Sequence, residues 1–430
     1  MAINRFFVPL RPGIMMASKN IEITAPVGSF ESLAAAIQAE TDSVYFGIGN
    51  LNMRSRSSVN FTHDDLVEIS QRCRENGISS YITLNSVIFD KEVDDMKKIV
   101  DAAKGNGITA IIAFDPAVIA YASSIGMPLH MSTQTNITNL ESVRYYAHFA
   151  DVMVLARELS LDQVTAITRS IEEQQITGPS GKLVRIEVFA HGALCMAISG
   201  KCYLSLDNYN ASANRGACYQ QCRHPYKVTD MDSGIELMID HEYILSPKDL
   251  CTIGFVDKII AAGVKVLKIE GRGRSPEYVK TVVKCYREAV DAIRDGTYSA
   301  EKVDAWMKRL ETVYNRGFWD GYYLGRKLGE WSDQYGSKAT QKKIYAGKVT
   351  NYFTKLKVVE IKMESGKLSV GDNILFTGPT TGVIEDTIRE IRVDLKPVEN
   401  IKKGELCSIP VNELIRRGDK VYKIVLTEEN

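Results

Sequence analysis

The chain alternates short apolar runs with longer helical patterns from Ile21 to about Arg294, and this alternation is the feature that most constrains its fold. Such alternation is typical of parallel β-strands joined by helices. We count eight apolar runs, at residues 21–26, 43–49, 79–85, 109–115, 128–134, 151–157, 184–192 and 264–272. Eight strand–helix units favour a closed (β/α)8 barrel over an open doubly wound sheet, which more usually has about six strands and a glycine-rich first turn.

Two residues mark the ends of helices within this alternation. Ser29 precedes an apolar helical pattern and is of a type that favours the N-cap, where its hydroxyl accepts a hydrogen bond from the first turn. Gly77 follows the helical pattern over residues 62–76, where a left-handed residue commonly ends a helix. The sequence therefore predicts one helix that begins after Ser29 and another that ends just before Gly77.

The pattern changes after Gly296. Residues 300–317 are helical in pattern, and residues 318–331 are rich in glycine and aromatic side chains. From Ile344 onward, β-branched stretches alternate with Gly and Asp turns, which indicates a small antiparallel β-barrel. The predicted organisation is an N-terminal extension (1–20), a barrel (21–298) with a cysteine-rich insertion after the seventh strand (191–245), a connector (299–342) and a C-terminal β-barrel (343–430).

Polar residues follow most of the predicted barrel strands. In a (β/α)8 barrel the carboxyl ends of the strands meet at one mouth, where the active site lies. We therefore expect the candidate site residues to gather there. They are Arg54, Arg56, Asn85, Asp115, Ser132, Gln134, Asn136, Arg157, Glu158, His191, Glu270 and Arg272.

Four of the eight cysteines stand close together after the seventh strand, in the spacing C-x6-C-x15-C-x3-C: Cys195, Cys202, Cys218 and Cys222. An iron–sulfur cluster takes four thiolates from loops of mixed spacing. Structural zinc usually takes two close Cys pairs, and only the last two cysteines form one. The spacing favours a 4Fe-4S cluster, with zinc or unligated, transiently oxidised thiols as alternatives.

The other cysteines lie in apolar patterns. Cys251 could replace one of the four ligands, but the stretch 246–256 places it on an apolar helical face, which favours a role in the core. Cys73, Cys285 and Cys407 lie in helical or strand patterns and are also expected in the core.

Targeting signals and charge limit the classes of protein. Pro9, Arg11 and Pro12 interrupt the apolar N-terminal stretch, and no run of about 18 apolar residues follows, so we expect a cytoplasmic protein that does not enter a membrane. Lys and Arg number 53, as do Asp and Glu, which leaves only a local patch for nucleic acid. The stretch 338–357 has six lysines and no acidic residue, and we predict either an RNA-binding surface or a solvated linker there.

The stretch "RIEVFAHGALCMAISGKCYLS" resembles the signature of the collagenase-like peptidase U32 family. The positions that fit this signature are Glu187, Phe189, Gly192, Cys195, Gly200, Cys202 and Ser205. "NRGACYQQCR" and "LKIEGR" also resemble family segments, and the similarity covers residues 25–325. The chain departs from the family at Glu40 and Thr41, where relatives commonly have Gly-Ala, and at residues 50–61, a segment usually rich in Gly and Ala.

The resemblance implies an RNA-hydroxylating enzyme. Similar members make 5-hydroxyuridine at the tRNA wobble position with prephenate involved, or act on a ribosomal RNA cytidine, and relatives in anaerobic ubiquinone synthesis carry 4Fe-4S clusters. We therefore expect a tRNA uridine 5-hydroxylase with tRNA as its partner, prephenate as co-substrate and a 4Fe-4S cluster. The number of subunits stays open.

Site roles follow from this expectation. Guanidinium groups suit a dicarboxylate because they bind carboxylates at two points. Arg54, Arg56, Gln134, His191, Glu270 and Arg272 are the predicted catalytic residues, and Ser132, Asn136 and Arg157 are predicted to bind the cofactor. The alternative is that each arginine forms an internal ion pair, for example Arg272 with Glu270, and that the asparagines cap a helix.

Two other functions compete with hydroxylation. A peptidase needs an activated nucleophile or a metal-bound water. "HEYIL" at His241 lacks the second histidine of a zinc protease because position 245 is Leu245. A dyad of His191 and Cys195 is possible, but it takes a thiolate from the four-cysteine set, and His191 could be purely structural. The other alternative is a non-catalytic iron–sulfur protein that binds or matures RNA.

Overall fold

The computed structural model describes residues 21–56, 60–227, 229, 231–234, 245–325, 330–333 and 336–427. The predicted N-terminal extension and His241 lie outside these residues. Within the described part of the chain, no helix is both long enough and apolar enough to cross a bilayer.

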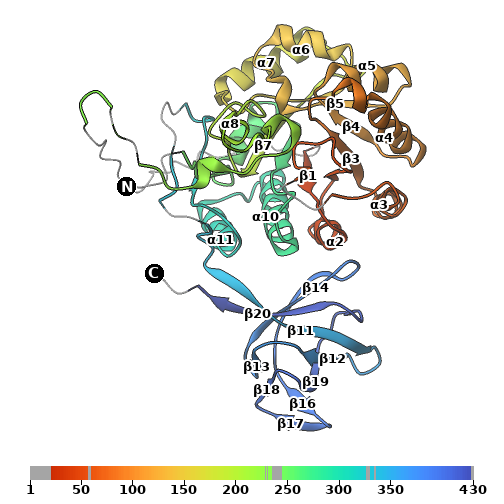
Figure 1. Cartoon of the computed structure of the whole chain (residues 1–430), viewed down its shortest axis with the longest axis vertical. Coiled ribbons are helices and arrows are strands. Elements are labelled where there is room, and N and C mark those ends of the chain that lie inside the picture. Colours follow the sequence, from red (N-terminus) through yellow and green to blue (C-terminus); the bar gives the residue numbers. More distant parts are fainter. Residues whose placement is uncertain are drawn as a thin grey trace.

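Eight parallel strands close into a barrel (Figure 1). They are β1 (Glu22–Pro26), β2 (Ser43–Gly47), β3 (Ser79–Leu84), β4 (Ala110–Ala113), β5 (Leu129–Met131), β6 (Val152–Val154), β7 (Arg185–Gly192) and β9 (Val266–Ile269). Each strand pairs with the next, and β9 pairs with both β7 and β1, which closes the ring. All eight predicted strands are confirmed, and the open doubly wound sheet is wrong.

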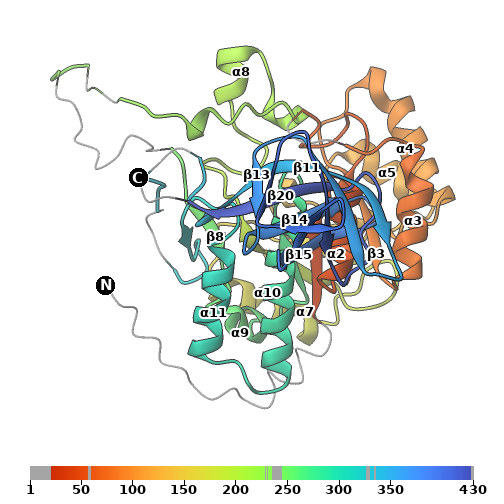
Figure 2. The same cartoon turned by 90° about the horizontal axis from the view of Figure 1, so that it is seen from below.

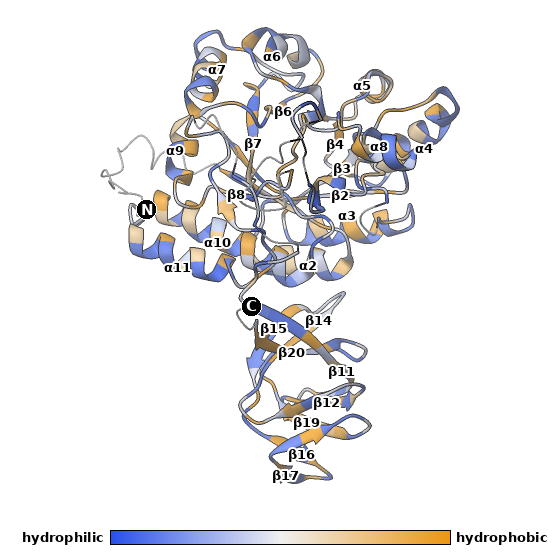
Figure 3. Cartoon of the chain, turned by 60° about the vertical axis from the view of Figure 1, so that its left-hand side comes forward, coloured by the Kyte–Doolittle hydropathy of each residue, from blue (hydrophilic) through white to orange (hydrophobic). Residues whose placement is uncertain are grey.

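Amphipathic helices surround the barrel, and most of them combine hydrophobic and hydrophilic residues (Figure 3). Ser29 caps the first helix as predicted, because its hydroxyl accepts from the Ser32 backbone N–H at 3.2 Å. Gly77 has a φ of 66°, which confirms the predicted left-handed helix end. The helices are α2 (Phe30–Gln38), α3 (Asp65–Glu75), α4 (Val93–Gly105), α5 (Pro116–Ser124), α6 (Leu140–Ala147), α7 (Leu161–Glu173), α9 (Val256–Ala261), α10 (Pro276–Arg294) and α11 (Ala300–Leu310).

The segment after β7 differs from the prediction. Within residues 246–256, expected to be helical, the chain forms a short strand, β8 (Asp249–Cys251), antiparallel to the end of β7, and β10 (Phe318–Trp319) pairs with β8. The helix itself, α9, begins only at Val256. β7 is longer than its neighbours, so its last backbone groups need a partner strand beyond the barrel. Cys251 is buried as expected, but in a strand instead of on a helix.

The segment between β7 and β8 holds the four clustered cysteines and the short helix α8 (Leu204–Tyr209), which lies apart from α9, α10 and α11 in Figure 2. Arg223 holds this segment against the barrel. Its guanidinium donates to the Leu194 carbonyl and the Pro247 carbonyl, both at 2.6 Å, and to the Ser246 hydroxyl at 2.9 Å. Arg223 therefore links the cysteine segment to residues on both sides of it, Leu194 before it and Ser246 and Pro247 after it.

The C-terminal part consists of antiparallel sheets, as predicted. An eight-stranded sheet has the order β15-β14-β20-β11-β12-β19-β16-β17, and β13 pairs with β18; no pairing joins β15 to β17 among the described residues, so the strand order is open. The strands are β11 (Gln341–Phe353), β12 (Val358–Met363), β13 (Lys367–Ser369), β14 (Asn373–Gly378), β15 (Gly382–Thr387), β16 (Ile391–Val393), β17 (Lys396–Val398), β18 (Asn400–Lys402), β19 (Leu406–Pro410) and β20 (Lys420–Leu426).

Helix α2 joins the barrel to these sheets. Ala35 packs with Leu375 and Val383 in a small apolar cluster. The Gln38 amide donates to the Thr381 carbonyl at 2.7 Å and accepts from the Val383 N–H at 3.0 Å. The sheets therefore lie against the outside of the barrel, beside its first helix (Figure 1).

Candidate functional site

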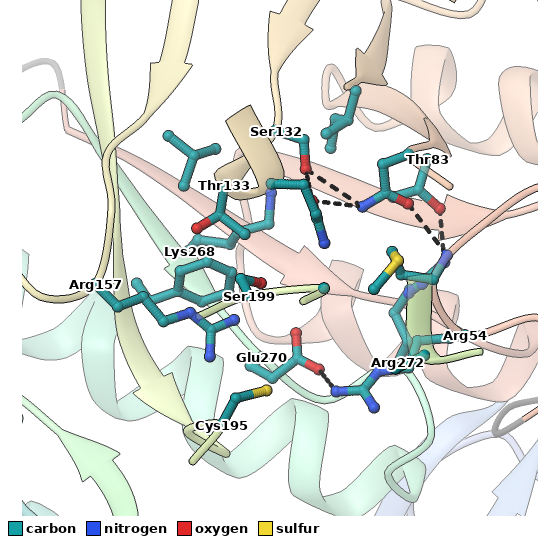
Figure 4. A pocket seen from close by; sticks show the side chains of 18 of the residues that line it. Arg54, Thr83, Ser132, Thr133, Arg157, Cys195, Ser199, Lys268, Glu270 and Arg272 are labelled. Atoms are coloured by element: carbon teal, nitrogen blue, oxygen red, sulfur yellow. Dashed lines mark hydrogen bonds and ion pairs between the residues drawn. The ribbon is translucent and has the colours of Figure 1, made fainter. Parts of the chain in front are cut away.

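A pocket opens at the carboxyl ends of the barrel strands, beside the cysteine segment (Figure 4). Ten of the predicted site residues line it: Arg54, Asn85, Ser132, Gln134, Arg157, Cys195, Cys202, Cys218, Glu270 and Arg272. Other lining residues that matter below are Tyr45, Thr83, Phe189 and Lys268. The strands bring these side chains together from widely separated parts of the sequence, as the barrel prediction requires.

Arg54 and Glu270 form an ion pair within the pocket. The Arg54 Nη2 and Glu270 Oε1 atoms are 2.7 Å apart, and the Glu270 side chain is 12% exposed. Burial alone raises the pKa of Glu270, but Arg54, Arg157 and Arg272 outweigh it and hold that pKa at about 2. The pKa of Arg54 is raised, first because of the Glu270 carboxylate and against the effect of burial. Both groups are therefore charged at neutral pH.

Arg272 lies deeper in the same pocket and makes no ion pair with Glu270, so the predicted Arg272–Glu270 alternative is wrong. Its Nη1 donates to the Thr83 hydroxyl at 2.6 Å and to the Asn52 amide oxygen at 3.2 Å. Burial lowers its pKa to about 10. A Cβ at Gly47 would lie 2.7 Å from this guanidinium, so only glycine leaves room for it at the end of β2.

Arg157 completes a group of three guanidiniums around one carboxylate. Its guanidinium stacks on the Phe189 ring at 3.9 Å, and Nη1 donates to the Ala193 carbonyl at 3.1 Å. Its buried Nε makes no hydrogen bond within the described structure. We call Arg54, Arg157, Arg272 and Glu270 the arginine–glutamate group. Because three cations face one anion, it has positive charge left to hold an anionic ligand.

Amide and hydroxyl groups form another wall of the pocket. The Asn85 amide donates to the Ser132 hydroxyl at 3.3 Å and to the Gln134 amide oxygen at 3.2 Å, and the Ser132 hydroxyl donates to that same oxygen. The Gln134 amide nitrogen donates no hydrogen bond to any described residue, although the side chain is largely buried. This wall can hydrogen-bond the polar edge of a planar ligand.

The four cysteines of the segment are gathered at the pocket. Three of them line it, and all four are free thiols. Burial raises the pKa of Cys222, Arg223 lowers it, and the other three thiols raise it, which shows that the four sulfurs share one electrostatic neighbourhood. In the described chain no three His, Cys, Asp or Glu side chains are grouped closely enough to hold a metal ion. The arrangement gives no support to a zinc site, whose ligands crowd around a single ion.

Three of the predicted catalytic and cofactor-binding residues lie elsewhere. His191 is 1% exposed and packs against Tyr278, Tyr286 and Phe318, and burial lowers its pKa to about 3. Its predicted place at the mouth is wrong because a bulge between Phe189 and His191 turns it outward toward α10. It therefore stays neutral and away from the pocket that Cys195 lines.

The other two lie at neighbouring surfaces. Arg56 is exposed and lines a separate hollow with Arg215 and Glu92. Asn136 ends a short 3-10 turn with a φ of 54° and lines an adjoining pocket that shares Arg157 and Cys195 with the main one. Arg56 is thus not part of the arginine–glutamate group, and Asn136 borders it from outside.

Sequence reasoning missed Lys268, Tyr45 and Phe189. A signal for them was present, because alternate residues of a strand face the same side. Lys268 is two residues before Glu270 in an otherwise apolar run, and Phe189 is opposite Lys268 in the register of β7 and β9. The period of two therefore places both side chains inside the barrel, one layer below the mouth.

Comparison with known proteins gives one family. A family model described as peptidase family U32 matches residues 28–333. A collagenase of Porphyromonas gingivalis is 56% identical over 96% of this chain and 100% of its own length. An uncharacterized protease of Methanocaldococcus jannaschii is 35% identical over 94% of this chain and 98% of its own length. A tRNA hydroxylation protein of Bacillus subtilis is 28% identical over 91% of each chain.

Proposed function

This chain belongs to peptidase family U32, and we propose that it is a tRNA-modifying enzyme that hydroxylates C5 of the wobble uridine. Prephenate is the proposed co-substrate, and a 4Fe-4S cluster is the proposed cofactor. The name of the tRNA hydroxylation protein of Bacillus subtilis supports the choice of RNA as substrate. The proposed partner is therefore tRNA, together with a small dicarboxylate.

The arginine–glutamate group carries this proposal. Three guanidiniums face one carboxylate whose pKa is held at about 2, so the group keeps a net positive charge at neutral pH. A dicarboxylate binds well where planar guanidiniums offer two donors to each carboxylate. Arg54 and Arg157 lie on either side of Glu270, and the Arg272 guanidinium points toward Thr83 (Figure 4). We assign the binding of prephenate to these residues.

The amide wall suits a nucleobase. Asn85, Ser132 and Gln134 present amide and hydroxyl groups at the side of a pocket whose other walls include Tyr45 and Phe189. A base must leave its stack before an enzyme can reach C5, and flipped bases are read by hydrogen bonds to their polar edges and by contacts with aromatic rings. The pocket therefore supports binding of an extruded pyrimidine.

Cys195, Cys202, Cys218 and Cys222 are the proposed ligands of the cluster. Their donor chemistry fits, because four free thiols share one neighbourhood beside cationic side chains. A cubane is several ångströms across, so its ligands stand further apart than those of a single ion. When bound there, the cluster would supply one-electron redox chemistry beside the pocket.

Nucleoside analysis of a deletion strain tests the proposed function. Mass spectrometry of tRNA should show loss of 5-hydroxyuridine and its derivatives, restored by the parent gene. The purified protein, reconstituted with iron and sulfide, should then modify unmodified tRNA in the presence of prephenate without another protein. Modification that needs a second protein would favour the alternative of a non-catalytic RNA-binding factor. Unchanged nucleosides in the deletion strain would exclude the proposed function.

Metal analysis tests the proposed cofactor. Anaerobically purified protein should hold about four irons and four sulfides per chain, because four thiolates complete the coordination of a cubane. Cys202→Ala and Cys218→Ala should abolish this content. Cys285→Ala is the matched control, because Cys285 is a buried core thiol away from the pocket. Stoichiometric zinc without sulfide would contradict the cluster.

Peptidase activity is the second candidate, and the name of the 56% identical collagenase favours it. The geometry of the pocket supports it less. The His191 ring packs in the core against Tyr278, Tyr286 and Phe318 and does not line the pocket that Cys195 lines, so it is not placed to activate that thiol. Incubation of the purified protein with denatured collagen, followed by electrophoresis, tests this function directly. Cleavage that disappears in a Cys195→Ser variant would establish it.

A further inference from the structure

Lys268 lies in β9, two residues before Glu270, and lines the same pocket one layer deeper in the barrel. The side chain is 5% exposed but lines the pocket. Its Nζ donates to Glu187 Oε1 at 2.6 Å, and this is its one hydrogen bond among the described residues. An ammonium has three donors, so two stay available to a bound molecule.

The surroundings of Lys268 fix the position of its charge. The Nζ atom lies 4.5 Å from the centre of the Tyr45 ring and 5.8 Å from that of Phe189. Glu187 is fully buried, and its second oxygen accepts no hydrogen bond within the described structure. The Lys268 ammonium therefore contacts Glu187 on one side and two aromatic rings on others, while its side toward the pocket stays open.

Stability gives no reason to keep this buried ion pair. Removing two charges from water is costly, and apolar residues of similar volume often replace such pairs without loss of stability. The pair is also incompletely hydrogen-bonded on both sides. A buried charge with unused donors at the end of a pocket instead suits the binding of an oxygen atom.

We infer that Lys268 is a substrate-contacting residue, whose ammonium donates to a substrate oxygen that carries full or partial negative charge. Glu187 acts through it as a positioning residue. The inference rests on the proposed function for the identity of that oxygen, which is a carbonyl oxygen of the extruded pyrimidine. The arginine–glutamate group at the mouth and Lys268 at the inner end then hold different molecules: the dicarboxylate outside and the base inside.

The double variant K268M/E187L tests the inference, because it replaces the ion pair by apolar side chains of similar size. The kcat/KM for unmodified tRNA should fall about tenfold to a hundredfold, the usual effect of losing a charge-assisted hydrogen bond. The dissociation constant for prephenate should change less than about twofold, since the outer arginines are intact. A defect in folding alone would weaken both.

The matched control is R185M/E22Q. It removes another ion pair of the barrel, between Arg185 and Glu22 at 2.7 Å, and neither residue lines the pocket. Its kcat/KM should stay within about threefold of the parent at equal folded fraction. If K268M/E187L does not fold, K268Q takes its place. Its kcat/KM is compared with that of the parent only if the two proteins have the same melting temperature.

A folded Lys268 variant whose kcat/KM equals that of the parent protein would overturn the inference. Failure of the proposed function is recognised separately, in the parent protein. If the parent cleaves denatured collagen and leaves tRNA nucleosides unchanged, the tRNA function is wrong, and the variants are compared by cleavage rate instead. A tenfold loss in K268M/E187L, with the control unaffected, then supports contact of Lys268 with a peptide carbonyl oxygen. An unchanged rate removes the inference in that case too.

Discussion

Two regions of this molecule are rich in cations, but their surroundings differ. At the barrel mouth, Arg54, Arg157 and Arg272 converge from three strand ends on Glu270 alone. In β11, Lys342, Lys343 and Lys348 lie on a partly exposed strand, and two of them face acids from other segments. Lys343 pairs with Glu277 at 2.8 Å, and Lys348 is 3.9 Å from Glu364.

The difference shows that the number of basic residues in a stretch does not fix the charge that a ligand meets. The segment 338–357 contains no acidic residue. Nevertheless, Glu277 of α10 and Glu364, which directly follows β12, lie beside its lysines. The predicted solvated linker is wrong, because residues 341–353 form a strand, whereas the RNA-binding surface stays a prediction. The mouth arginines keep an excess of charge because only one carboxylate lies among them. The following changes test this contrast.

Glu270→Gln should have the largest effect on stability. The folded pKa of Glu270 is about 2 and its ordinary value is 4.5, which corresponds to about 3 kcal/mol. Because the folded pKa is the lower one, this stabilisation is present above pH 4.5 and is lost as the pH falls toward 2. Urea unfolding at pH 7 should show a loss of about 3 kcal/mol in the variant.

The pH dependence gives the control for this prediction. Between pH 4.5 and about 2, the free energy of unfolding should fall more steeply in the parent than in Glu270→Gln. Glu141→Gln, which removes an exposed partner of Arg144, should lose less than about 0.5 kcal/mol. Equal slopes in parent and Glu270→Gln would mean that the mouth arginines do not act on this carboxylate.

Arg54→Lys and Arg272→Lys should each lower turnover about tenfold to a hundredfold, because lysine cannot make a planar two-point contact with a carboxylate. The rate of tRNA hydroxylation as a function of prephenate concentration is the measurement. Arg56→Lys is a matched control close in sequence, since Arg56 lies outside the pocket. Equal activity in Arg54→Lys, Arg272→Lys and Arg56→Lys would show that the dicarboxylate does not bind at the mouth.

The β11 lysines should contribute less than their number suggests. Each phosphate contact adds roughly 0.7 to 0.9 to the logarithmic salt dependence of RNA binding. Changing Lys342, Lys343 and Lys348 to Gln should therefore lower that slope by about one unit instead of two, because two of the three already face acids. Binding of tRNA measured over a series of KCl concentrations tests this. An unchanged slope would place the RNA contacts outside β11.

The ion pair between Lys343 and Glu277 should have the smallest effect. It links β11 to α10, with side-chain exposures of 28% and 18%. A double-mutant cycle with Lys343→Met and Glu277→Gln should give a coupling energy below about 1 kcal/mol by urea unfolding. A coupling comparable to the loss in Glu270→Gln would show that the two cation-rich regions do not differ in the way described.

Local patterns predicted much of the fold because they depend on neighbouring residues. The apolar runs gave all eight barrel strands, and Ser29 and Gly77 gave helix ends, since capping and left-handed turns are set by one or two side chains. β8 was missed because its partner is the free end of β7, about 60 residues away, and a three-residue strand has no period of its own.

The sequence by itself determined that polar side chains meet at one mouth of a barrel, because parallel strands end on the same side and their residues alternate with a period of two. Only the tertiary structure decided which of them share a pocket. One extra residue of β7, the bulge before His191, turns that ring into the core, while Phe189 and Lys268 keep the period and stay inside. A bulge depends on pairing with a distant strand, here β9, so the residues of β7 alone do not reveal it.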